Sequence, residues 1–366
     1  MNFLDYASTC PVVKYPQQLY RNVLGEGYFF NPNANYAYKE KRLLSEAENK
    51  VKKAIGAKGG KIIFGGTSSQ LIENLMVAID EQTNYCHIIC SAFEHDSFFR
   101  HGNVIGYSKK DLLNKLQIAK EYVTEAQKFV VWQGVNNLTG EIFPITEIGN
   151  ACHEHDTSHI CDMTAMIGKI PIPTNIDQWC DCAVWSGHKL GTELGIGAMW
   201  VSDRLDKWLN GFKLHGTPNL VGALAMAQAV EDACDSRSLD ERTIRYNELQ
   251  NYLIGYLVGE NIDFHLVPEY DEQPSGHEFI SAINTIRLPG IDVNALQQYL
   301  ASKRIYIGVG HSSCADNKDF RILQYGYGLS EKEASEVIRI SFGENSNETD
   351  ILALAQGVKE FKEKFV

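Results

Sequence analysis

A lysine that follows a short apolar strand is the residue of this chain with the clearest potential for chemistry. The run 182–185 predicts the strand, and Ser186, His188 and Lys189 follow it directly. A lysine amine in this position can form a Schiff base with an aldehyde cofactor, while the serine and the histidine offer donors to a phosphate group of that cofactor. Lysines beside glycines are also common solvent-exposed loop residues. This segment therefore supports a cofactor site only together with the rest of the sequence.

Polar residues also follow other predicted strands in the first two thirds of the chain. Short apolar runs predict strands at 61–64, 87–90, 129–133, 159–161, 183–185 and 198–201, and amphipathic runs predict helices at about 38–55, 69–80, 110–127 and 145–155. Such alternation predicts a mostly parallel sheet with helices on both faces, which binds ligands at the carboxyl ends of its strands. The polar clusters at those ends are 65–69, 91–95, 136–140, Asp162 and 186–189.

The last third of the chain predicts a small α+β domain. A capping box at Ser238–Glu241 predicts the start of a long helix that reaches about residue 258, with Ile244 and Leu253 on its inner face. Strands are expected at 278–288, 305–308 and 337–342, and helices at 293–302, after the capping box 330–333, and at about 348–365.

Composition narrows the classes of function. The chain has a formal net charge of −12 and no lysine and arginine block, which argues against direct contact with nucleic acid. No apolar run is long enough for a membrane span, and no leader-peptide pattern is seen near Met1, so we expect a cytoplasmic location. Nine cysteines in 366 residues argue for reduced thiols. The histidines and the cysteine between 153 and 161 could suggest a metal site, but a helix end that runs into a strand explains them equally well, so no metal is expected.

The clusters at the strand ends together match what pyridoxal 5'-phosphate (PLP) requires. Lys189 supplies the amine for the aldehyde, and Asp162 can keep the pyridine nitrogen protonated. His95 can lie on the face of the ring, and the turn 65–69 at a helix N-terminus offers N–H groups to the phosphate. Each residue alone has a plain structural explanation, such as a helix cap or a turn. The prediction therefore rests on their order and on their shared placement.

These motifs resemble those of the cysteine desulfurases, PLP-dependent enzymes of the class-V aminotransferase type with fold type I. The similarity spans nearly the whole chain. The matching stretches are Phe3–Thr9, Asn31-Pro-Asn33, Gly65–Ser69, Glu94-His95, Asn136–Gly140, Ser186–Lys189 and Arg339–Gly343.

The resemblance implies a role for each matching residue. Lys189 would form the Schiff base, His95 would stack on the ring and relay protons, and Asp162 would pair with the ring nitrogen. Asn137 and Arg339 would bind the substrate carboxylate, which suits the planar fork of an arginine. The full set of cofactor-binding residues would be Gly66, Thr67, His95, Asp162, Ser186, His188, Lys189 and Thr217, the last reaching the phosphate of the neighbouring subunit in a homodimer.

Cys314 lies where the family keeps its catalytic thiol, in the stretch His311–Ala315. The implied activity converts L-cysteine to L-alanine, with Lys189, Cys314 and His95 as catalytic residues. The sulfur would remain on Cys314 as a persulfide and pass to a sulfur-acceptor protein. The sequence does not identify this acceptor, so iron–sulfur assembly, tRNA thiolation and DNA sulfur modification all stay open.

The resemblance also implies a seven-stranded sheet and three segments. Residues 1–15 would pack with the small domain, 16–250 would form the large PLP-binding domain, and 251–366 would form the small C-terminal domain with the cysteine loop. Two departures from the family pattern are Ala165, where a glutamine usually contacts the ring hydroxyl, and Leu138, where a glutamate is usual. A selenocysteine lyase, or another class-V lyase or aminotransferase, stays open as an alternative. A non-catalytic sulfur-transfer partner with this fold is the alternative from another class.

Overall fold

The computed structural model describes residues 1–11, 15, 19, 30–83, 85–122, 127–268, 278–310 and 319–366. The chain forms two compact units. The larger unit comprises residues 12–134 and 144–239, and the smaller unit comprises residues 1–11, 135–143 and 240–366. Residues 135–143 and 240–250 thus belong to the smaller unit, whereas the expected division assigned them to the large domain.

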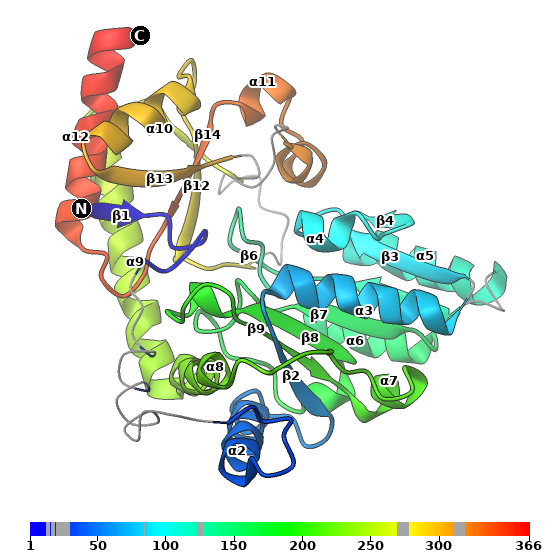
Figure 1. The fold of residues 1–366 in the computed structure, drawn as a ribbon. Coiled ribbons are helices and arrows are strands. Elements are labelled where there is room, and N and C mark those ends of the chain that lie inside the picture. Colours follow the sequence, from blue (N-terminus) through cyan, green and yellow to red (C-terminus); the bar gives the residue numbers. More distant parts are fainter. Residues whose placement is uncertain are drawn as a thin grey trace. The chain divides into compact units, whose positions relative to one another are not determined.

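The larger unit is built on a seven-stranded sheet (Figure 1). Only β9 runs antiparallel to its neighbours; the other strands share one direction. This confirms the predicted mostly parallel α/β fold, although β4, with three residues, was too short to be predicted. In sheet order the strands are β2 (Lys61–Gly65), β9 (Gly197–Val201), β8 (Cys182–Ser186), β7 (Ser158–Asp162), β5 (Gln127–Val131), β3 (Cys86–Ser91) and β4 (Val104–Gly106).

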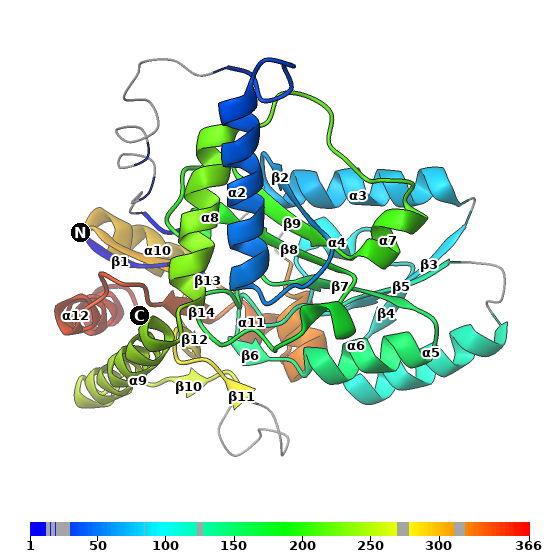
Figure 2. The ribbon, with the colours of Figure 1, turned by 90° about the horizontal axis from the view of Figure 1, so that it is seen from below.

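Helices bury both faces of this sheet. Alternate strand residues point to opposite faces, and on both faces they are buried: Phe129 and Val131 belong to the core beneath α3, and Val130 on the other face is also 0% exposed. Helix α2 packs along α8 (Figure 2). The helices are α2 (Tyr38–Ala54), α3 (Ser68–Gln82), α4 (Asp96–Phe99), α5 (Lys109–Tyr122), α6 (Ile145–Glu154), α7 (Asp203–Trp208) and α8 (Leu220–Cys234). The helix predicted for 110–127 is shorter than expected, because residue 127 already starts β5.

The smaller unit contains a five-stranded sheet in the order β1-β13-β14-β12-β10. The N-terminal strand β1 pairs in parallel with β13, and the remaining pairs are antiparallel. The strands are β1 (Asn2–Leu4), β13 (Ile305–Val309), β14 (Val337–Ser341), β12 (Ile283–Arg287) and β10 (His265–Leu266), and a separate pair joins β6 (Glu141–Ile142) to β11 (Glu278–Phe279). The helices are α9 (Ser236–Gly259), α10 (Val293–Ser302), α11 (Glu331–Ala334) and α12 (Glu348–Phe365), and a π-helix spans Ile322–Gly326.

Three details of this part differ from the predictions. The strand expected at 278–288 is interrupted, because β11 pairs with β6 while β12 pairs with β14. Helix α9 begins before the expected capping box, because Asp235 accepts hydrogen bonds from the N–H and the hydroxyl of Ser238 (2.9 and 2.7 Å). Ile244 is 61% exposed, whereas Leu253 is buried as expected. Among the helices of the described residues, none combines the length and the apolar character needed to cross a bilayer.

Candidate active site

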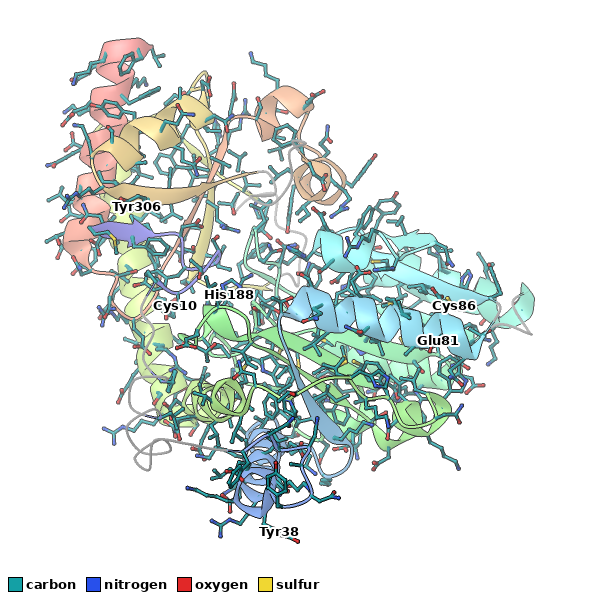
Figure 3. All side chains as sticks on the ribbon, in the orientation of Figure 1. Cys10, Tyr38, Glu81, Cys86, His188 and Tyr306 are labelled. Carbon is teal, nitrogen blue, oxygen red and sulfur yellow. The ribbon has the colours of Figure 1, made fainter. Side chains whose placement is uncertain are left out.

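Three of the predicted cofactor-binding segments follow strands that end at one edge of the larger unit's sheet. In the strand register Ser186 at the end of β8 lies opposite Gly197, and Gly197 lies opposite Gly65 at the end of β2. Asp162 ends the next strand, β7, and lies opposite Val184. The strand register therefore places the phosphate turn, the lysine segment and the aspartate at the same edge, as predicted. Figure 3 shows His188 at this end of the sheet and Cys86, where β3 begins, at the other.

The phosphate turn is held at the N-terminus of α3. The Thr67 side chain accepts a hydrogen bond from the N–H of Gln70 (3.0 Å), which leaves the hydroxyl hydrogen available for an anion. The N–H of Gly66 donates to Oε1 of Gln70 (3.1 Å). Free N–H groups and the helix dipole make such a terminus favourable for phosphate. A phosphate that used the Gly66 N–H would need the Gln70 side chain to turn away.

The lysine lies in a short 3-10 helix, Gly187–Lys189, directly after β8. The N–H of Gly187 donates to the carbonyl of Ile196 (3.0 Å), and a Cβ at position 187 would push against the side chains of Thr192, Met226 and Ile196, so any larger residue would need these side chains to shift. Burial, and secondarily the charge of Lys189, lowers the pKa of His188. At neutral pH His188 is therefore an uncharged imidazole in this structure, able to donate one hydrogen bond to a phosphate.

Asp162 is fixed by the chain that follows it. Its Oδ1 accepts a hydrogen bond from the N–H of Thr164 (2.8 Å). Ala165, where the family pattern has glutamine, is 8% exposed and carries no hydrogen-bonding side chain. The hydroxyl of Thr164 is buried without a hydrogen-bond partner among the described residues. A polar side chain thus lies next to the position where the glutamine is missing.

His95 caps helix α4, and this fixes the chemistry of its ring. Nδ1 accepts a hydrogen bond from the backbone N–H of Ser97 (3.2 Å) and lies 2.9 Å from the Ser97 hydroxyl. A backbone N–H can only donate, so Nδ1 carries no proton. The proton of the neutral ring is therefore on Nε2, the single ring atom that can give or take a proton.

Thr217 is exposed on the surface of the larger unit. Its hydroxyl accepts a hydrogen bond from the Asn31 side chain (3.2 Å), and Asn33 donates to the carbonyl of Gly216 (2.8 Å). A cavity of about 460 Å³ is lined by Thr217 together with Gly65 and other residues of this region. Neither Lys189 nor Asp162 lines this cavity, so it lies beside the phosphate turn and not over the lysine.

The two residues expected to bind the substrate carboxylate come together in the smaller unit. Arg339, in β14, donates from Nη1 to the carbonyl oxygen of Asn137 (3.0 Å) and from Nη2 to Oδ1 of Asp5 (2.7 Å). The arginine is only 7% exposed. Nε of Arg339 and Oδ1 of Asn137 are buried without hydrogen-bond partners among the described residues. Sequence reasoning gave Asp5 no role, although it lies in a motif shared with the cysteine desulfurases.

Cys314 lies outside the described residues. Two of the histidines considered for a metal contact Asp181, which accepts hydrogen bonds from Nε2 of His153 (3.0 Å) and from the backbone N–H of His159 (2.9 Å). Within the described part of the chain, no three His, Cys, Asp or Glu side chains are grouped as metal ligands.

The chain is similar to known proteins over almost its full length. The family model described as aminotransferase class-V matches residues 3–354. A curated relative named cysteine desulfurase IscS, from Dictyoglomus turgidum, is 29% identical over 69% of this chain and 68% of its own length. A putative cysteine desulfurase IscS 1 from Bacillus subtilis is 24% identical over 98% of this chain and 97% of its own.

Solved structures show the same fold. The NifS-like protein from Rickettsia africae superposes with a TM-score of 0.80 at 21% sequence identity, covering 99% of each chain. The apo structure of a cysteine desulfurase from Thermococcus onnurineus gives a TM-score of 0.74 at 18% identity, covering 99% of this chain and 94% of that one. The predicted resemblance to PLP-dependent cysteine desulfurases is therefore confirmed, and the chain belongs to the aminotransferase class-V family.

Proposed function

We propose that this PLP-dependent enzyme converts L-cysteine to L-alanine and passes the sulfur, by way of a persulfide on Cys314, to an acceptor protein. The observation that carries the proposal is the common edge of the larger unit's sheet, where the phosphate turn follows β2, the Ser186–Lys189 segment follows β8 and Asp162 ends β7. The curated relatives named as cysteine desulfurases support the choice of substrate over the other class-V activities.

The residues at this edge fit PLP. Lys189 offers the amine, Asp162 the carboxylate for the ring nitrogen, and Thr67 a hydroxyl at a helix N-terminus for the phosphate. Gly66, Ser186, His188 and, from a neighbouring subunit, Thr217 complete the proposed phosphate site. When bound, PLP supplies an electron sink for the electron pair left on Cα after proton removal.

The chain's own residues would carry the proton and the sulfur. Lys189 removes the Cα proton of the substrate, and Asp162 holds the proton on the ring nitrogen by its negative charge. His95, with Nδ1 occupied by the Ser97 N–H, moves a proton only at Nε2. The Cys314 thiolate attacks the substrate sulfur; the S–S bond forms, the Cβ–S bond breaks, and its electron pair stays with the carbon that leaves as alanine after protonation.

The substrate is held by its carboxylate in this proposal. Arg339 presents a buried guanidinium that the carbonyl of Asn137 and the carboxylate of Asp5 fix in place. Such a fixed planar donor can bind an α-carboxylate through parallel hydrogen bonds.

The first test separates the lysine from the cysteine. Lys189→Ala should abolish the visible chromophore of the purified protein and its sensitivity to borohydride. Cys314→Ala should keep the chromophore but lose the production of alanine and sulfide from L-cysteine in the presence of a thiol. Cys86→Ala is the matched control, since this half-buried thiol starts β3 at the other end of the sheet and should be dispensable.

The outcomes distinguish the alternatives. Undiminished sulfide release by Cys314→Ala would remove the assigned role of that residue. Retention of activity toward L-selenocysteine alone in this variant would favour a selenocysteine lyase. A colourless wild-type protein would favour a non-catalytic sulfur-transfer partner.

A homodimer and a cytoplasmic location complete the proposal. The exposed Thr217 supports a dimer in which it meets the phosphate of the second subunit. Sedimentation of the wild-type protein should give a dimer. Thr217→Ala should weaken PLP binding, while the protein stays dimeric. Mass spectrometry of Cys314 after addition of L-cysteine, followed by capture of proteins that accept the persulfide sulfur, would identify the acceptor.

A further inference from the structure

The buried guanidinium of Arg339 already has a carboxylate partner within the chain. Nη2 donates to Oδ1 of Asp5 at 2.7 Å, and this oxygen belongs to a side chain that is itself only 17% exposed. The opposite end of the guanidinium is held by the carbonyl of Asn137 through Nη1. Nε remains a buried donor without a partner among the described residues. The arginine is thus anchored at two points, and the Nε–H together with the second hydrogens of Nη1 and Nη2 is left for a ligand.

The N-terminal segment carries Asp5 to this place by strand pairing. Residues 2–4 pair in parallel with 305–307 of β13, and the chain then passes to β14, where Asp5 bridges to Ser341. The N–H of Ala7 donates to the Ser341 hydroxyl at 2.8 Å, which fixes the segment on both sides of Asp5. Ser341 is two residues beyond Arg339, so the two charged side chains meet on the same face of the sheet.

Gly308 of β13 provides the space for the ion pair. A Cβ at this position would lie 2.9 Å from Oδ1 of Asp5 and 3.0 Å from Nε of Arg339. Any side chain at 308 would therefore displace one member of the pair. The glycine, the aspartate and the arginine form one arrangement, contributed by three segments of the smaller unit.

The charge of Asp5 affects how tightly this arrangement binds a carboxylate ligand. A buried guanidinium without a counter-ion is strongly unfavourable, so Asp5 stabilises the empty site. An incoming α-carboxylate then meets an arginine whose charge is already balanced, and it is repelled by Asp5. Because both side chains are largely buried, water screens this repulsion only in part, and the aspartate has a measurable effect on ligand affinity.

We propose that Asp5 is a positioning residue that sets the affinity of the amino-acid carboxylate site: its hydrogen bond anchors Arg339, and its charge weakens carboxylate binding. The proposal rests on the role of Arg339 in the proposed function. L-cysteine and L-alanine carry the same α-carboxylate, so Asp5 lowers the affinity of substrate and product alike and favours release of the product.

The test compares two ligands on the PLP-loaded protein by titrating the cofactor absorbance. L-alanine has the carboxylate and L-alaninamide lacks it, so the ratio of their dissociation constants isolates the contribution of the carboxylate. Asp5→Asn keeps an acceptor oxygen but removes the charge, and it should bind L-alanine about tenfold more tightly with little change for L-alaninamide. Asp5→Ala removes the anchor too, and its preference for L-alanine should fall below that of Asp5→Asn.

Glu336→Gln is the matched control, because Glu336, which directly precedes β14, is the buried partner of Arg287 in β12 (3.0 Å). It should lower the melting temperature but leave the ligand ratio unchanged. An unchanged or lower preference for L-alanine in Asp5→Asn would overturn the role of the charge, and equal preferences in the Asn and Ala variants would overturn the anchoring role. If Arg339→Gln leaves the ratio at the wild-type value, the carboxylate role of Arg339 in the proposed function fails instead.

Discussion

Gly197 of β9 lies against Thr67, the residue that caps α3. A Cβ atom at position 197 would come within 2.7 Å of the carbonyl carbon of Thr67 and within 2.6 Å of the backbone nitrogen of Ser68. No flexible side chain could move aside, because the neighbouring atoms are backbone. The antiparallel strand can therefore approach the phosphate turn only with glycine at this position.

Gly197→Ala should displace the phosphate turn. We expect the affinity for PLP to fall at least about tenfold and the free energy of unfolding to fall by about 1–3 kcal/mol, as for other overpacked sites. Equilibrium dialysis of PLP and thermal unfolding of the apo protein measure the two effects. Gly255→Ala in α9 is the control, because a Cβ there meets nothing within 4 Å and alanine is favoured in helices. Equal PLP affinities for both variants would contradict this explanation.

Ser97 should control the proton on His95. In ¹⁵N spectra of the imidazole, we expect the neutral ring of His95 to carry its proton on Nε2, because Nδ1 accepts from the Ser97 N–H. Ser97→Ala removes the hydroxyl at 2.9 Å but keeps this N–H. Because Nδ1 then loses its hydrogen bond with the hydroxyl, Ser97→Ala should reduce kcat severalfold and shift the pH profile of kcat, with the affinity for PLP unchanged. A neutral ring protonated on Nδ1 would show that the cap is not maintained in solution.

Asp181 should make the protein sensitive to acid. Burial opposes the charge of this carboxylate, but hydrogen bonds from His153 and Arg204 outweigh it and lower the pKa to about 2. The ordinary value is about 3.9. Because the folded-state pKa is depressed, the stabilisation is present above about pH 4 and is lost as the pH falls toward 2.

The corresponding variant is Asp181→Asn. It should cost about 2 kcal/mol of unfolding free energy near neutral pH and progressively less below pH 4. Urea unfolding at pH 6.5 and pH 3 measures the difference. A cost that is independent of pH would mean that the charge of Asp181 contributes little.

Tyr327 should stabilise the turn that carries Asn137. Its hydroxyl contacts Oγ1 of Thr139 (2.7 Å) and donates to the buried carboxylate of Glu141. Burial, and then the charge of Glu141, raises the pKa of Tyr327, so the phenol stays protonated and remains a donor. Tyr327→Phe should cost about 1–3 kcal/mol, because Glu141 loses a buried donor.

The kinetic consequence of Tyr327→Phe should appear mainly in KM for L-cysteine, because the affected turn carries a residue proposed to bind substrate. Steady-state kinetics and thermal unfolding separate the two effects. A fall in kcat with KM unchanged would place Tyr327 in the chemical step instead.

The polar residues at the edge of the large sheet could be predicted from the sequence, because each of them directly follows or ends a strand that the local pattern identifies. Lys189 follows its strand, Asp162 ends the next, and parallel pairing then brings them to one edge. Features that depend on the pairing of strands far apart in the sequence were not predictable. The break between β11 and β12 arises because the two strands have different partners. The contact between Asp5 and Arg339 likewise depends on the pairing of β1 with β13, which no local pattern encodes.

That pairing has a consequence for the order of events during synthesis. Strand β1 is synthesised long before its partner β13, which spans Ile305–Val309, and before β14 at Val337–Ser341. The larger unit ends at residue 239 and can form much of its sheet while these strands are still untranslated. Strand β1 must therefore wait without its partner until β13 has been translated, and closing this long loop is expected to be a late, slow event in folding.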